Sequence, residues 1–225
     1  MQKIKLEKLN RNEALRYMGH RGEVSTALEA LMEKCEAELL EHISPAFIYK
    51  VFDIEESDEA VNVCSTTLTL RGKDIREHLS GCSRAVLLCA TIGPAVDSFI
   101  RKKEITDMSS AFAADALASA AIEQVCTMAD EIIKSQLPDK FFTWRFSPGY
   151  GDFPLDTQRD FLNVMNAQKR IGLCLEESNI LTPRKSVTAV AGISDHQVER
   201  KKRGCASCNM ASKCNFRKRG EHCGF

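Results

Sequence analysis

Apolar positions in the first half of the chain follow two different periods. Between residues 24 and 43 they recur every three or four positions, which predicts a long helix, and a shorter helical pattern covers 11–18. The runs 47–54 and 61–70 are apolar and separated by an acidic turn, which predicts two strands paired as a hairpin. A short helix is expected at 73–79.

The second half of the chain also contains both helical and strand-like apolar patterns. Residues 84–91 form an uninterrupted apolar run, which predicts a central strand, and Pro94 then suits the start of a helix. The longest helical pattern, at 109–136, is rich in alanine and is expected to be the central helix. An aromatic, strand-like run at 141–146 precedes a predicted helix at 157–170. A last strand is expected at 187–193.

Interleaved helices and strands with a hairpin predict an α+β domain with a mixed or antiparallel sheet and long helices. A chain of 225 residues can bury a substantial core. Apolar periodicity stops near Ser194. We therefore expect one domain over residues 1–195 and a small appended module over 196–225.

Charge and hydropathy limit the classes of partner. Lysine plus arginine number 31 and aspartate plus glutamate number 31, so no net field draws the protein to nucleic acid or an anionic membrane. No apolar run reaches membrane-spanning length, and the polar start lacks a signal-peptide core. A cytoplasmic protein without a membrane partner is expected.

Six of the ten cysteines are dispersed among apolar neighbours and are expected to be small core residues. Without a secretion signal, a disulfide framework is not expected. The six are Cys35, Cys64, Cys82, Cys89, Cys126 and Cys174.

The other four cysteines, Cys205, Cys208, Cys214 and Cys223, lie close together near the end of the sequence. A Cys-x-x-Cys turn followed by two further cysteines is typical of a metal site, and zinc and a four-iron four-sulfur (4Fe-4S) cluster both accept four thiolates. His222 is a possible substitute ligand. The alternative is a set of free thiols or a local redox pair.

The most informative segment is Arg145-Phe146-Ser147-Pro148-Gly149-Tyr150-Gly151-Asp152. Arginine can bind a carboxylate or phosphate through two parallel hydrogen bonds, and glycine lets backbone approach a ligand closely. An ordinary Pro-Gly turn with a solvated arginine is the alternative. The spacing of Asp152, Asp156 and Asp160 favours acidic charge at the amino end of the helix that follows.

Three short motifs follow one another between Arg145 and Ile193: Arg145-x-x-Pro148-Gly149-Tyr150, Ile171-Gly172-x-x-Leu175-x-Glu177-Ser178 and Pro183-x-x-Ser186-Val187. Through these motifs the chain resembles the activation domain of cobalamin-dependent methionine synthase. Thr91-Ile92-Gly93 and the helix carrying Asp115 fit the same family more loosely. The cysteine-rich tail departs from that family.

The resemblance implies a methyltransferase function in methionine biosynthesis. Such a domain takes part in the reductive reactivation of cob(II)alamin, with S-adenosylmethionine as methyl donor and one electron from a flavodoxin or ferredoxin. Cobalamin is carried by the partner, here a separate methionine synthase core. The task is positioning, so no catalytic side chain is assigned. A 4Fe-4S cluster at the tail cysteines would provide an electron relay; zinc is the other choice.

The resemblance also implies the S-adenosylmethionine contacts. Arg145 matches an arginine that contacts the ligand, Ser147 lies where backbone is offered, and Tyr150 can line the face shared with the corrin. Pro148, Gly149 and Gly151 complete the loop. The family's acidic contact on the long helix falls on Ser119, with Glu123 one turn further as its possible replacement. The alternative is that the contact is missing and Glu123 is an ordinary solvated glutamate.

Three other functions stay open at this point. The protein can serve another corrinoid methyltransferase, or be a structural subunit that has kept only the fold. From a different class comes a zinc-binding module for nucleic acid, in which the basic tail residues would contact phosphates. Those residues are Lys201, Lys202, Arg203, Arg217, Lys218 and Arg219.

Overall fold

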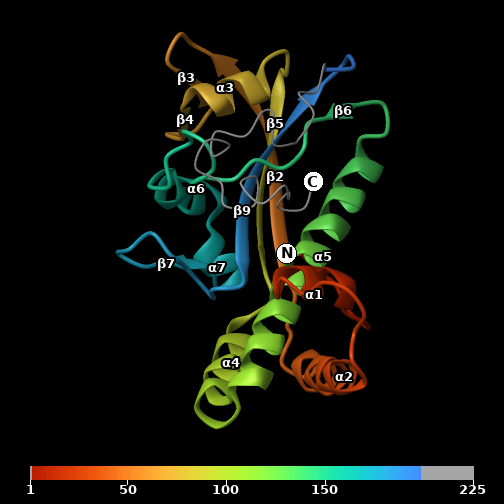
Figure 1. Cartoon of the computed structure of the whole chain (residues 1–225). Helices are drawn as coiled ribbons and strands as arrows, with labels where there is room; N and C mark the ends of the chain where they lie inside the picture. The colour runs from red at the N-terminus through yellow and green to blue at the C-terminus, as the bar shows by residue number, and fades with distance from the viewer. Residues whose placement is uncertain (1, 199–225) are drawn as a thin grey trace.

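The computed structural model describes residues 2–198, and the predictions for the tail cysteines and the basic tail lie outside them. Within residues 2–198 no helix is both long and apolar enough to cross a membrane. A seven-stranded antiparallel sheet forms the centre of the fold, in the order β4-β3-β2-β5-β9-β6, with β1 paired to β2 (Figure 1). The α+β class is confirmed, and the sheet is antiparallel rather than mixed.

Three long strands make the middle of this sheet: β2 (Ala46–Glu56), β5 (Arg84–Thr91) and β9 (Ser186–Ser194). The short strands around them are β1 (Gln2–Lys3), β3 (Ala60–Val63), β4 (Thr69–Arg71) and β6 (Phe141–Phe142). A separate hairpin pairs β7 (Cys174–Leu175) with β8 (Leu181–Thr182).

Helices cover both faces of the sheet (Figure 1). One face packs against α5 (Met108–Gln136), which α1 (Arg11–Tyr17), α2 (Thr26–Leu40) and α4 (Pro94–Thr106) contact in turn. The other face packs against α3 (Lys73–Leu79), α6 (Thr157–Met165) and α7 (Ala167–Ile171).

Two cores explain the uninterrupted apolar run of β5. Val86 and Leu88 point into the core beneath α5, whereas Leu87 and Cys89 point into the core beneath α3 and α6. A strand with helices on both faces has no solvent side, so polar residues do not alternate along it. The sequence prediction of a central strand is confirmed.

Helix α5 is the longest element and crosses the sheet beside β5 and β9 (Figure 1). It begins after Asp107, whose carboxylate accepts hydrogen bonds from the backbone N–H groups of Ser109 and Ser110. Buried alanines occupy its inner face, which lets the helix approach its neighbours closely.

Two elements are broken where the sequence predicted continuous ones. The run 61–70 is two strands joined by a turn at Ser65 (φ 61°), in which the Thr66 hydroxyl donates to the Val63 carbonyl. The helix predicted at 157–170 is interrupted by Asn166, whose left-handed conformation ends α6 before α7 begins. Short polar side chains that bond to nearby backbone favour such turns.

The expectation for the dispersed cysteines is half right. Cys35, Cys89 and Cys126 are fully buried core residues. Cys64, Cys82 and Cys174 are only partly buried.

Candidate functional site

A β-bulge places Arg145 on the α5 face of the sheet. Phe142 pairs with Ile193 of β9, and Phe146 pairs with Val190, so three residues of this segment lie opposite two of β9. Phe142 belongs to the core beneath α5 and Phe146 packs on the opposite core. The extra residue reverses the alternation and turns Arg145 towards α5. Of the strand predicted at 141–146, residues 141–142 and Phe146 pair with β9, and the bulge interrupts the pairing between them.

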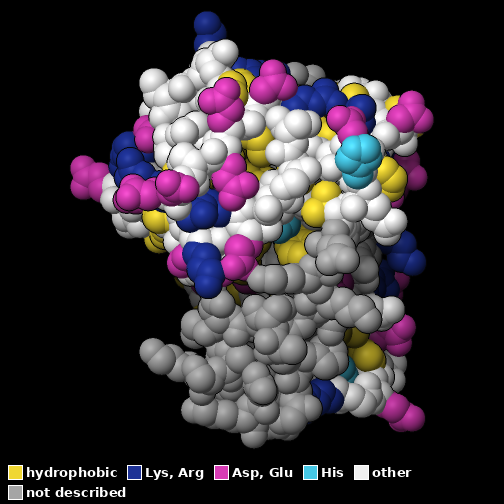
Figure 2. All heavy atoms as spheres, turned by 90° about the horizontal axis from the view of Figure 1, so that it is seen from above, with side chains coloured by type: hydrophobic (Ala, Val, Ile, Leu, Met, Phe, Trp, Pro, Cys, Tyr) yellow, Lys and Arg dark blue, Asp and Glu magenta, His cyan; other side chains and the backbone are white. Residues whose placement is uncertain are grey.

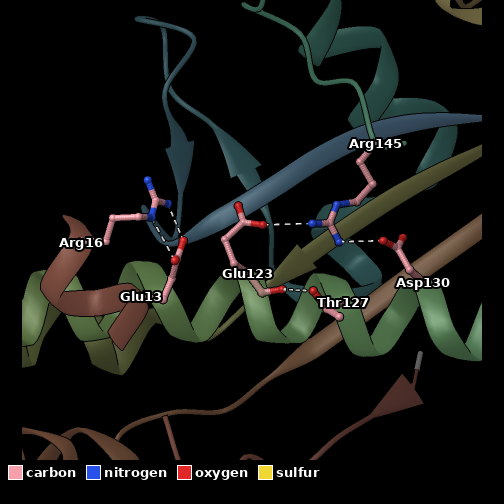
Figure 3. A network of polar contacts seen from close by, with 6 residues as sticks. All are labelled: Glu13, Arg16, Glu123, Thr127, Asp130 and Arg145. Atoms are coloured by element: carbon pink, nitrogen blue, oxygen red, sulfur yellow. Dashed lines mark hydrogen bonds and ion pairs between the residues drawn. The ribbon is translucent and has the colours of Figure 1, made fainter. Parts of the chain in front are cut away.

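Arg145 reaches between two carboxylates of α5 (Figure 3). Its Nη2 donates to Glu123 Oε2 and its Nη1 to Asp130 Oδ2, both at 3.0 Å. The Arg145 side chain is 19% exposed, against 46% for Glu123 and 31% for Asp130. The prediction of an ordinary solvated arginine is wrong, because the guanidinium is largely buried and held by charge-assisted bonds.

A cavity of about 160 Å³ adjoins this arginine on the Asp130 side. Its lining combines polar and apolar surface, and the polar groups come from Asp130, Thr143, Lys134 and Arg145. The remaining lining residues are Val86, Leu88, Ile133, Phe142, Trp144, Ala189 and Ala191. Small-ligand sites usually combine apolar surface with a few convergent polar groups, and this cavity is more polar than most of them.

The charge around Arg145 includes the end of α1. Figure 3 shows the Glu13–Arg16 ion pair of α1 beside the same stretch of α5. Burial, and secondarily the negative charge of Glu123, raise the pKa of Tyr17 to about 12. The Tyr17 hydroxyl therefore keeps its proton at neutral pH and can act as a hydrogen-bond donor.

Cys126 of α5 lies close enough to Arg145, Glu123 and Asp130 to feel their charges, but it is buried. Burial raises the pKa of its thiol to about 12, and the charge of Arg145 lowers it only partly. A thiol of this kind stays protonated at neutral pH and is a poor nucleophile. Covalent chemistry at this cysteine is therefore not expected.

The residues of the loop that follows Arg145 differ in their exposure to solvent. Ser147 is partly buried, Pro148 is buried, and Gly149 and Gly151 are exposed with positive φ. The Tyr150 side chain is 68% exposed and does not line the cavity. The structure thus brings Arg145 and Glu123 together but leaves Tyr150 on the open side of the loop.

Asp152 differs from the sequence expectation. Its carboxylate accepts from the backbone N–H groups of Lys73 and Asp74, so it caps α3 rather than the helix that follows it in sequence. Asp156 and Asp160 lie at the start of α6, where the sequence placed acidic charge.

Ser119 lies one turn before Glu123 and accepts a hydrogen bond from Lys185 rather than from Arg145. Lys185 Nζ lies 2.9 Å from Ser119 Oγ and 2.7 Å from Asp115 Oδ1, and the Lys185 side chain is 16% exposed. The Ser119 hydroxyl donates to the Asp115 carbonyl. Ser119 is therefore occupied by structural contacts, whereas Glu123 is next to Arg145.

The other matching motifs lie away from Arg145, at the end of α7 and where β5 ends beside the start of β9. Thr91 pairs with Ser186, and their hydroxyl oxygens are 2.8 Å apart. Gly172 ends α7 in a left-handed conformation. These motifs support the fold and do not reach the cavity.

Sequence reasoning missed Asp130, Trp144, His78 and Lys185. Asp130 lies two helical turns after Glu123, so the helical period could have placed both acids on one face. The other three depend on contacts between distant elements. Within residues 2–198, no group of three or more His, Cys, Asp or Glu side chains is arranged to hold a metal.

Surface charge gives no sign of a nucleic-acid site on the face that is visible from above. Seen from the end that carries α3 and β3, acidic and basic side chains of the described residues are interspersed (Figure 2). This distribution matches the balanced composition of the chain.

Comparison with known proteins identifies the fold. No family model and no curated protein matches this chain. Among solved structures, the crystal structure of the MetH reactivation domain bound to AdoHcy matches with a TM-score of 0.62 and 12% sequence identity. The match covers 88% of this chain and 80% of that chain. At this identity the likeness establishes fold alone: the chain has the fold of the MetH reactivation domain.

Proposed function

We propose that this protein binds S-adenosylmethionine between α5 and the sheet and supplies its methyl group for the reductive reactivation of cobalamin on a separate methionine synthase core. The observation that carries the proposal is the position of Arg145 between Glu123 and Asp130, at the mouth of the cavity. The fold supports it, because the structural neighbour was crystallised with AdoHcy.

The charges of the site complement the amino-acid end of the ligand. A guanidinium such as that of Arg145 suits a ligand carboxylate, because it presents its N–H donors in a fixed fork. Glu123, which is half exposed, can accept from the ligand ammonium group. Arg145 with its two acids has one net negative charge, and Lys134 in the cavity wall offsets it. Ser147 offers backbone, and Pro148, Gly149 and Gly151 set the course of the loop.

The cavity suits the adenine ring. At about 160 Å³ it is smaller than a pocket for a whole ligand, which is typically at least about 300 Å³. Trp144 and Phe142 offer aromatic surface, and Asp130 can accept from the exocyclic amine. The sulfonium group then lies outside the cavity, where a separate protein can reach its methyl group. The exposed Tyr150 is available to the same partner.

The chemistry itself is supplied by the bound groups. When a flavodoxin or ferredoxin has supplied one electron, the partner's cobalamin would accept the methyl group of S-adenosylmethionine, and S-adenosylhomocysteine would be the other product. This chain binds and orients the donor. We further propose that the module 196–225 binds zinc or a 4Fe-4S cluster through Cys205, Cys208, Cys214 and Cys223.

Calorimetric titration with S-adenosylmethionine and S-adenosylhomocysteine tests the binding step. Both should bind, because the proposed contacts are to the amino-acid end and the adenine ring, which the two ligands share. Raising the salt from about 50 mM to about 300 mM should weaken both, because salt screens charges near the surface. A folded protein that binds neither ligand would contradict the proposal.

A further inference from the structure

Helix α3 contacts both ends of residues 143–152, which we call the arginine loop. At one end Asp152 caps the helix, and at the other end His78, in the last turn of α3, contacts the backbone beside Arg145. The helix lies on the face of the sheet opposite α5 and is absent from the cavity lining. It contacts β9 as well as the loop, and its polar contacts at Asp152 and His78 reach the site through the loop that carries Arg145.

The Asp152 contact is reciprocal. Asp152 Oδ2 accepts from the Lys73 N–H at 2.7 Å and Oδ1 from the Asp74 N–H at 2.9 Å, while the Asp152 N–H donates to Asp74 Oδ2 at 3.1 Å. The approach requires glycine at position 72. A Cβ there would lie 2.8 Å from the Asp152 carbonyl oxygen, and φ is +119°.

The His78 contact lies next to Arg145. His78 Nε2 is 2.8 Å from the Trp144 carbonyl oxygen and 2.8 Å from Thr143 Oγ1. The imidazole ring stacks on Phe146 at 5.1 Å and meets the Trp144 ring edge-on at 4.8 Å. His78 is nearly buried, so its position is fixed by these neighbours.

Contacts inside the loop connect its two ends. Phe153, which follows Asp152, is buried and lies 6.2 Å from Phe146, ring centroid to ring centroid. The Gly149 N–H donates to the Phe153 carbonyl at 2.8 Å. Packed rings and backbone bonds therefore connect the segment at Asp152 to the backbone beside Arg145.

We propose that Asp152 and His78 are positioning residues, through which α3 holds the arginine loop in the form that binds S-adenosylmethionine. The ligand-binding part of this inference rests on the proposed function. When only part of the population has the binding-competent loop, the apparent affinity falls in proportion. Asp152 therefore acts on affinity without touching the ligand.

Trp144 is the only tryptophan of the chain and reports on the loop directly. The test compares Asp152→Ala and Asp152→Asn with Asp160→Asn, a change of an exposed acid on α6, as matched control. Iodide quenching of Trp144 fluorescence is measured without ligand, and the affinity for S-adenosylmethionine by calorimetry. His78→Leu serves as a second variant at the other end of the loop.

Asp152→Ala should raise the quenching of Trp144 and weaken binding about three- to tenfold, since a lost cap of this kind shifts a local equilibrium by about that factor. Asp152→Asn keeps one acceptor oxygen, so its quenching and its affinity should lie between those of wild type and Asp152→Ala. His78→Leu should raise quenching, and the control should change neither quantity.

Unchanged quenching in both Asp152→Ala and His78→Leu would overturn the inference. Raised quenching with unchanged affinity would make the contacts structural only and would overturn the positioning role. If wild type binds no S-adenosylmethionine but quenching rises, the proposed function fails while the hold of α3 on the loop stands.

Discussion

Arg145 and Glu123 are 22 positions apart in the sequence, yet Arg145 Nη2 and Glu123 Oε2 lie 3.0 Å apart in the fold. The pair joins the bulged segment after β6 to the middle of α5. Because Asp130 holds the other edge of the same guanidinium, Arg145 is fixed before any ligand arrives. Such preorganisation reduces the entropy that binding must overcome.

Replacing Arg145 by alanine should weaken S-adenosylmethionine binding about 10- to 100-fold, the usual effect of losing a charged hydrogen-bond partner. The fold should persist, because ion pairs to partly exposed carboxylates contribute little stability. Calorimetry and circular dichroism measure the two effects. Arg101→Ala, on the exposed side of α4, is the control. Equal affinities for wild type and Arg145→Ala would remove the central assignment.

Glu123→Gln should weaken binding more than Ser119→Ala. Glutamine at position 123 loses the negative charge that attracts the ligand ammonium group, whereas the Ser119 hydroxyl is engaged with Lys185 and the Asp115 carbonyl. Titration of both variants with S-adenosylmethionine decides the question. A larger loss for Ser119→Ala would mean that Ser119 has kept the role of the acidic contact.

The arginine loop should loosen in acid. Burial acts to raise the pKa of Asp152, but the backbone N–H groups of Asp74 and Lys73 lower it by more, so the pKa lies below its usual value. A carboxyl group of this kind contributes stability above its unfolded pKa and loses it as the pH falls through the folded pKa. The contact should therefore be intact at neutral pH and weaken below about pH 4.

Trp144 fluorescence, followed from about pH 6 to about pH 3, measures this effect. Other carboxylates titrate in the same range, so the informative quantity is the difference between wild type and Asp152→Asn. Superimposable titration curves for the two proteins would show that Asp152 does not control the loop.

Metal content tests the tail prediction separately. Cys205 and Cys208 changed together to serine should abolish bound zinc or iron, since two thiolates of a four-thiolate site are lost. Affinity for S-adenosylmethionine should be unchanged if the module is independent of the site. Elemental analysis of anaerobically purified protein gives the first result, and calorimetry the second. Wild-type protein without zinc, iron or sulfide would contradict the metal site.

The long elements could be predicted from sequence because their signal is local. Helix α5 and strand β5 each show one pattern over their whole length, and both lie where the sequence placed them. Breaks were harder to predict, because the turns at Ser65 and Asn166 depend on positive φ at these residues rather than on the hydrophobic pattern.

The candidate site was predictable only in part. Arg145 and Glu123 carry sequence signals, the first through its loop and the second through helical spacing. The bulge that turns Arg145 towards α5 depends on how its segment pairs with β9. The capping of α3 joins Asp152 to Lys73 and Asp74, which precede it by 79 and 78 positions. No local pattern encodes such contacts.

Transfer of the isotopically labelled methyl group from S-adenosylmethionine to a cob(II)alamin-loaded methionine synthase core, in the presence of a chemical reductant, tests the central claim most directly. With this protein present, label should appear on the cobalamin and S-adenosylhomocysteine should form in equal amount, and Arg145→Ala should reduce both at a subsaturating concentration of S-adenosylmethionine. No transfer by a wild-type protein that binds S-adenosylmethionine would contradict the account and would direct the search to a different corrinoid partner.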